Sequence, residues 1–205
     1  MTAILKVDTI QDTSGNNIIN ENANTITIGK SGDTTNIVGT LQNDGAALIS
    51  GITMVDQFAL TSNFSLSNGA NIITANLARV SNGESPGFIG TGMTESSGIF
   101  TFPSTGIYII TFNAFANSSA AALYNTRQIQ VTLNNSSYAT AASSDGNFYA
   151  GTSYGGSSVQ YILDVTDTAN VKVRFRIDGQ GTNTTLLGNS GTNDTSFTFI
   201  RLGDT

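Results

Sequence analysis

The sequence lacks two side chains on which much of protein chemistry depends. Its 205 residues include no cysteine and no histidine. Without cysteine there is no disulfide and no thiolate, and without histidine the commonest general base and metal ligand is missing. Serine and threonine are plentiful, but a nucleophilic triad needs a base beside the hydroxyl, and lysine is scarce. We therefore predict that the protein is not an enzyme.

Charge and long hydrophobic runs are also scarce. Charged residues make up 11% of the chain, and 8 basic against 14 acidic residues give a net charge of −6. An acidic chain repels phosphate backbones, so we expect no nucleic-acid partner. No apolar run reaches the roughly 18 residues of a transmembrane helix, and residues 1–8 lack the apolar core of about 7–15 residues of a signal peptide. We expect the protein to be made in a cytoplasm, and we expect no insertion into a membrane.

No segment carries a helical stripe, whereas several segments alternate in strict period two. The clearest is 171–177, where the odd positions are apolar and the even positions are lysine or arginine. Three further segments alternate in a similar way, namely 129–133, 159–165 and 197–202. Glycine, serine, threonine and asparagine favour turns and strands over helices. The fold class predicted from these patterns is all-β.

Residues 1–50 differ from the rest of the chain. Short apolar pairs alternate with turn clusters at 14–17, 29–33 and 43–45. Strands of about 3–5 residues cannot stand alone in water, so this segment either is disordered or shares its apolar groups with identical copies. The near-regular spacing of the isoleucine pairs favours an intertwined β stem. We predict a stem over 1–50, a connector near 46–54 and a head over 51–205.

The strand expected over 106–115 is apolar on both faces. One row holds Tyr108, Ile110 and Phe112, and the other holds Ile107, Ile109 and Phe115. A sheet with one face in water does not need two apolar rows, so we expect one row to be covered by another subunit. The alternative is a strand buried on both faces within one sandwich.

Three segments in order resemble tumour-necrosis-factor-like and complement-globular-head proteins. They are 98–112, with its Phe, Pro/Gly turn and Gly-x-Tyr, then 158–177, and the closing strand 195–202, where Thr198 replaces the usual glycine. The resemblance implies a jelly-roll sandwich and a homotrimer packed through aromatic faces. The residues that it suggests for the trimer interface are Tyr108, Ile110, Phe112, Phe197 and Phe199.

The first thirty residues resemble the opening of structural proteins of marine phages, notably those of cyanobacteria. The matching segments are 4–10, 14–20 and 25–29. The resemblance implies a stem attached to the virion through another virion protein of the tail or capsid. The candidate anchor residues are Ile4, Leu5, Val7 and Ile10.

Aromatic residues also fall in segments predicted to be loops. Phe148, Tyr149 and Tyr154 lie among Gly, Asn and Ser, and Tyr124 lies in a second such segment. Tyrosine with small polar residues is typical of recognition loops, because it gives contact area at small entropic cost. We take these four residues as candidate ligand contacts; the alternative is that the rings close the open end of the sandwich.

Other chemistry finds little support. The acid pairs Glu84 with Glu95 and Asp164 with Asp167 are typical of solvated turns rather than of a glycosidase. No loop carries the dense acidic spacing of a calcium site, and the glycine turns at 90–92 and 179–181 do not lead into a helix that would bind phosphate. We predict no metal and no cofactor.

These patterns together predict a homotrimeric virion fibre whose jelly-roll head attaches to a host-surface glycan or protein. Three weak sites per fibre would add avidity without a tight pocket. The alternatives are a head fibre or decoration protein that stabilises or coats the capsid, a polysaccharide depolymerase, and a host-encoded secreted lectin.

Overall fold

The structure, a computed structural model, describes residues 51–79, 87–149 and 151–205 and, before them, positions 34, 37–39, 41–43 and 46–47. The chain divides into two units, Met1–Leu48 and Ile49–Thr205. In the first unit the described elements are β1 (Gln42–Asn43) and β2 (Ala46–Ala47), which pair antiparallel. The predicted stem over 1–50 and the anchor residues Ile4, Leu5, Val7 and Ile10 fall largely or wholly outside the described residues.

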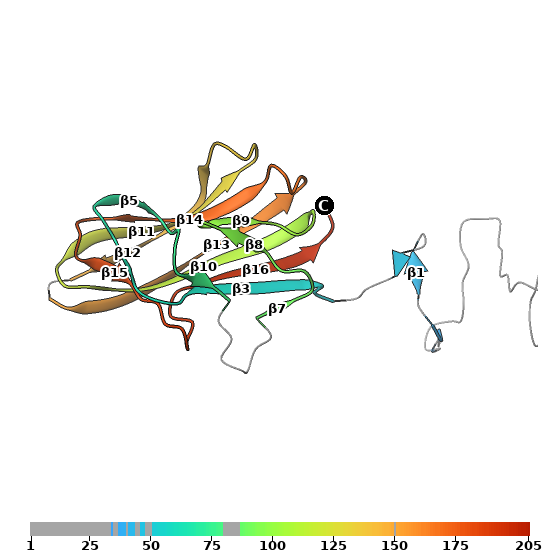
Figure 1. Cartoon of the computed structure of the whole chain (residues 1–205), viewed down its shortest axis with the longest axis horizontal. Coiled ribbons are helices and arrows are strands. Elements are labelled where there is room, and N and C mark those ends of the chain that lie inside the picture. Colours follow the sequence, from blue (N-terminus) through green and yellow to red (C-terminus); the bar gives the residue numbers. More distant parts are fainter. Residues whose placement is uncertain are drawn as a thin grey trace, which may run out of the picture. The chain divides into compact units, whose positions relative to one another are not determined.

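The second unit contains two antiparallel sheets (Figure 1). The larger, called the first sheet, is built around β10, which pairs with β13 on one side and with β16 and β15 on the other. Its eight strands are β3 (Met54–Leu60), β4 (Phe64–Ser65), β6 (Leu77–Ala78), β7 (Phe88–Ile89), β10 (Gly106–Ser118), β13 (Ser153–Val165), β15 (Thr184–Leu186) and β16 (Ser196–Gly203).

The second sheet has six strands, in which β14 is central and pairs with β11 on one side and with β5 and β9 on the other. The strands are β5 (Gly69–Ile72), β8 (Thr94–Ser96), β9 (Ile99–Thr101), β11 (Ala122–Thr132), β12 (Ala139–Phe148) and β14 (Lys172–Gly179). Every regular element among the described residues is a strand, so the all-β prediction is confirmed.

The core lies between the two sheets and is rich in phenylalanine. Phe175 of β14 lies 4.5 Å from the Phe197 ring and 5.3 Å from the Phe112 ring, measured between centroids. Phe100 of β9 lies 5.1 Å from Phe199. Aromatic rings at these separations bury a large area and gain further from their mutual orientation. The period-two positions of β14 are buried as the sequence predicted.

The prediction of the trimer interface is wrong. Tyr108, Ile110, Phe112, Phe197 and Phe199 are all 0% exposed within the single chain. They face the second sheet and belong to the chain's own core. A fully buried side chain has no surface to offer another subunit. The outward row of β10 is the other one, Ile107, Ile109 and Phe115.

The turn between β8 and β9 shows why glycine is needed at one position. Ser97 and Gly98 both have positive φ, 51° and 81°, as a tight hairpin turn of this hand requires. A Cβ on Gly98 would lie 2.1 Å from the carbonyl oxygen of Ile73. The Glu95 side chain closes the turn by accepting a hydrogen bond from the Gly98 amide at 2.7 Å.

Candidate binding surfaces

The outer face of the first sheet carries an aliphatic row that crosses five strands. Ile109 of β10 lies opposite Ile162 of β13 on one side and Ile200 of β16 on the other. Ile200 lies opposite Val55 of β3, which lies opposite Ile89 of β7. Residues directly opposite in antiparallel strands share a face. We call Ile162, Ile109, Ile200, Val55 and Ile89 the aliphatic row.

The aliphatic row is partly open to solvent at its ends, where Ile162 is 59% and Ile89 52% exposed. The corresponding face of the second sheet is different. There Arg174 donates a hydrogen bond to Gln130 at 2.8 Å, and its guanidinium lies 4.0 Å from the centroid of the Tyr138 ring. An antiparallel sheet normally turns a polar face of this second kind to water. The aliphatic row is therefore the unusual surface of the sandwich.

A polar row lies next to the aliphatic row on the same face. Gln160 donates to the Thr111 hydroxyl at 3.1 Å, and Gln57 donates to the Thr198 hydroxyl at 2.8 Å. These four side chains occupy neighbouring strands in register. The two amides are thus already supplied with partners, so a covering surface need not provide them.

An aromatic pair marks the far end of this face. The Phe115 and Tyr154 rings are 6.1 Å apart between centroids and nearly parallel, at 28°. Tyr154 belongs to β13 rather than to a loop, and it is 64% exposed. It therefore shares the face of the aliphatic row.

The structure does not bring the four candidate ligand contacts together. Phe148 is 5% exposed and packs in the core, with its ring 3.2 Å from where a Cβ of Gly155 would lie. Its prediction as a ligand contact is wrong, because the ring belongs to the core of the sandwich. Tyr149 is 79% exposed beyond the end of β12, and Tyr124 is 44% exposed on β11.

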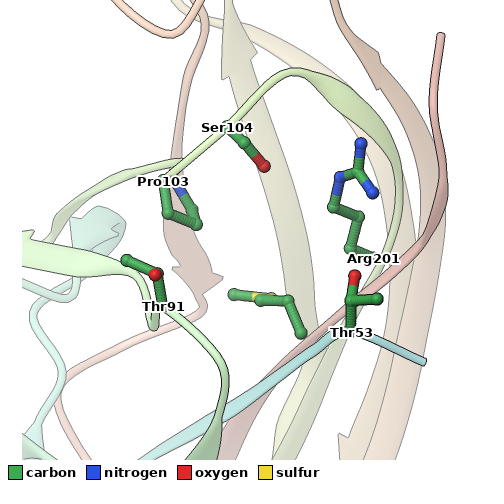
Figure 2. Close-up of a pocket in the computed structure, with 6 residues that line it drawn as sticks. Thr53, Thr91, Pro103, Ser104 and Arg201 are labelled. Atoms are coloured by element: carbon green, nitrogen blue, oxygen red, sulfur yellow. The ribbon is translucent and has the colours of Figure 1, made fainter. Parts of the chain in front are cut away.

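Two of the hollows on the described surface of the sandwich are candidate binding sites. One, of about 290 Å³, is lined by Leu123, Asp145, Gly146 and Asn147. The other, of about 200 Å³, is lined by Met54 and by the five labelled residues of Figure 2, Thr53, Thr91, Pro103, Ser104 and Arg201. Arg201 is the charged residue there, and it already donates to the Thr105 carbonyl at 3.0 Å and pairs with Asp204. Neither hollow gathers the groups that catalysis requires.

Of the acidic residues considered from the sequence, Asp164 lies in β13, whereas Glu95 and Asp167 accept hydrogen bonds within turns. Asp167 accepts hydrogen bonds from the Asn170 side chain at 2.6 Å and from the Ala169 amide at 2.8 Å. The Asn170 bond, followed by the Ala169 bond, lowers the pKa of the Asp167 carboxyl. Glu84 lies outside the described residues. Among the residues that the structure describes, no three acidic side chains gather as a metal site would require.

The sequence analysis missed a buried ion pair. Asp56 of β3 is 0% exposed and accepts from Arg79 twice, at 2.8 Å from Nε and 2.7 Å from Nη2. Its Oδ2 also accepts from the Met93 amide at 2.6 Å, and Arg79 donates to the Met93 carbonyl at 2.6 Å. The sequence does contain a signal for this pair. Asp56 alternates with the apolar residues Met54 and Phe58, so it lies on the inward face of the strand. This network joins three segments and has a structural role.

Comparisons with known proteins bear on the fold. No protein-family model matches the chain, and no curated protein matches it. Crystal structures of murine APRIL at pH 8.5, 8.0 and 5.0 are similar, with TM-scores of 0.51, 0.52 and 0.50 and sequence identities of 13%, 11% and 12%. Each comparison covers 73% of this chain and 98% of the APRIL chain.

The fold is thus a tumour-necrosis-factor-like jelly roll, and that prediction is confirmed. Sequence identity this low establishes fold and nothing further. The described residues contain no helix with the length and apolar character needed to cross a membrane.

Proposed function

We propose that the protein is a non-enzymatic, homotrimeric structural protein of a bacteriophage particle, and that its jelly-roll head attaches to a glycan or protein on the host surface. The observation that supports the assembly is the aliphatic row, with its ends open to solvent on a sandwich whose own core is complete. The phage origin rests on the resemblance of residues 1–29 to structural proteins of marine phages.

Self-association is the simplest use of the aliphatic row. Each aliphatic side chain removed from water contributes about 1.5–3 kcal/mol, and a continuous apolar strip favours contact with another apolar surface. In a homotrimer each copy supplies both the row and the surface that covers it. The number three comes from the resemblance to tumour-necrosis-factor-like proteins, whose members are homotrimers.

The surface outside the aliphatic row is better suited to attachment than to catalysis. Among the described residues, the carboxylates of Glu95 and Asp167 accept hydrogen bonds within turns and that of Asp56 pairs with Arg79, and the chain has no histidine to act as a base. Exposed Tyr149 and Tyr124 offer flat rings of the kind that stack on sugars. Three copies of a weak site bind with an avidity that no single site has. Tyr154 belongs with the assembly face, since it stacks on Phe115.

The experiment begins with the mass of the full chain by light scattering. We expect three chains of 21.3 kDa, about 64 kDa together. Ile162→Asp places a charge in the aliphatic row and should give a folded monomer. Leu133→Asp is the matched control, because Leu133 is a 69% exposed aliphatic residue outside the row. A wild-type monomer, or an Ile162→Asp trimer, would contradict the proposed assembly.

Attachment is tested by competition. Wild-type trimer added to host cells should block phage adsorption, and the same trimer should release no reducing ends from host polysaccharide. Sugar release would establish the depolymerase in its place. A particle reconstruction that places the protein over the capsid surface would establish the decoration role.

A further inference from the structure

Polar side chains interrupt the apolar interior at one end of the sandwich. Asn125 and Arg127 lie two residues apart on the inward face of β11, in line with Ile129 and Val131. Asn125 is 0% exposed and Arg127 is 1% exposed. Burial of this kind is costly for an amide and far more so for a charge, unless partners are supplied.

Few such partners are present among the described residues. Arg127 donates from Nη1 to the Asn125 carbonyl at 2.6 Å, but its Nε has no partner there, and neither do Nδ2 and Oδ1 of Asn125. None of the three ion pairs in the described part of the chain includes Arg127. Asp145 lies opposite Thr126 and accepts from its hydroxyl at 2.5 Å, on the other face of the sheet. The guanidinium therefore has no direct ion pair there, although the charge of Asp145 acts on it at longer range.

A third buried polar group lies on β13. The Phe148 ring of β12 lies against Gly155 of β13, and the two strands are in contact. Two residues further inward on each strand are Gly146 and Ser157, which a continued antiparallel course would place level with one another. Gly146 is paired with Asn125, and a Cβ on it would lie 2.2 Å from Nη1 of Arg127. The hydroxyl of Ser157 is also buried without a partner in the described structure.

The unpaired groups at this place are mostly donors. They comprise Arg127 Nε, both hydrogens of Asn125 Nδ2 and the Ser157 hydroxyl, against one obligate acceptor, Asn125 Oδ1. Donors in excess around a positive charge that has no direct ion pair match an anion. A water molecule would accept two of these hydrogen bonds but leave the guanidinium without a direct ion pair. Because interiors are close-packed, the anion that needs least room is monatomic.

We propose that Arg127, Asn125 and Ser157 form an internal binding site for a halide ion, with chloride as the ordinary occupant. The ion would accept hydrogen bonds from the guanidinium, the amide and the hydroxyl, and it would supply a counter-charge in direct contact with the guanidinium. It would be a structural ion that links β11 of the second sheet to β13 of the first sheet. The site is independent of the proposed attachment function.

The direct test is crystallisation of the full chain in sodium bromide. An anomalous peak between Arg127, Asn125 and Ser157 is the expected result, because bromide replaces chloride with little change in size. The same crystals grown in sodium fluoride should show no peak. Electron density at this place without an anomalous signal would identify water and overturn the proposal.

The solution test is thermal unfolding at constant ionic strength while chloride replaces gluconate. For a ligand that binds only the folded chain, a tenfold excess over its dissociation constant should raise the melting temperature by about 3–6 °C. Ser157→Ala should reduce this shift at least threefold, since it removes one donor without disturbing the packing of large groups. Arg174→Gln is the control, an arginine on the outer face, and should keep the full shift. Equal shifts in Ser157→Ala and the wild type would contradict the site.

Discussion

The guanidinium of Arg79 donates two nearly parallel hydrogen bonds to the carboxylate of Asp56, at 2.8 and 2.7 Å. It also lies 4.5 Å from the ring centroid of Phe58 and 4.7 Å from that of Phe88. A side chain from the end of β6 is thus held against two strands of the same sheet. Because Asp56 is fully buried, Arg79 is the counter-charge that its carboxylate requires.

Arg79→Met should destabilise the protein by about 3–5 kcal/mol, because it leaves a buried carboxylate without its counter-charge. Urea unfolding followed by circular dichroism measures the loss. The double variant Arg79→Met/Asp56→Leu removes both charges and should recover part of the stability. A loss below about 1 kcal/mol in the single variant would mean that solvent reaches Asp56.

Gly98→Ala should be far more destabilising than Gly181→Ala. Both glycines have positive φ, 81° and 78°, so each alanine carries a backbone cost of about 1 kcal/mol. At Gly98 the new Cβ would also lie 2.1 Å from the Ile73 carbonyl oxygen, whereas the nearest atom at Gly181 is 4.0 Å away. We expect a total loss of about 3 kcal/mol at Gly98, measured by urea unfolding. Equal losses would show that the β8–β9 turn moves freely.

The Asp167 turn predicts a pH dependence with a definite sign. Hydrogen bonds from Asn170 and Ala169 lower the pKa of the Asp167 carboxyl in the folded state. Its contribution to stability is therefore present above the pKa of an unfolded aspartate, and it is lost as the pH falls through the lowered folded pKa. Asn170→Ala removes the larger cause, so an NMR titration should find the Asp167 pKa raised relative to the wild type. An unchanged titration would assign the shift to the backbone bonds.

Tyr149 and Tyr154 should separate attachment from assembly. Tyr149→Ala removes an exposed ring beyond β12 and should weaken adsorption to host cells about tenfold or more per trimer, because the loss repeats at each site. Tyr154→Ala removes the partner of Phe115 and should lower the temperature at which the trimer dissociates, with adsorption unchanged. Host-cell binding and light scattering on the same samples distinguish the two. Reversed outcomes would place the ligand on the outer face of the first sheet.

Period-two alternation predicted the strands well where only one face is apolar. In β14 the apolar positions Val173 and Phe175 alternate with Arg174 and Arg176, so both the strand and its inward face follow from the sequence. In β10 both faces are apolar, and alternation then identifies the strand without saying which row faces the core. The row with Phe112 faces inward because the phenylalanines of β16 and β14 pack against it.

The remaining errors arose where tertiary pairing overrides local pattern. Phe148 lies among Gly, Asn and Ser in a segment predicted to be a loop, yet it ends strand β12 (Ala139–Phe148), because β11 supplies the hydrogen-bond ladder. Phe148 is then carried into the core at the end of that strand. Asp56 and Arg127 are charged residues on inward faces, and only the three-dimensional surroundings of each show whether it has a partner.

Gly146 has no side chain, and the guanidinium of Arg127 on the neighbouring strand fills the space that a Cβ would need. Any larger residue at 146 would displace the guanidinium, so the two positions should change together as the sequence diverges. Related chains that have lost the glycine are expected to carry a short, uncharged residue at 127, and chains that keep the arginine are expected to keep the glycine.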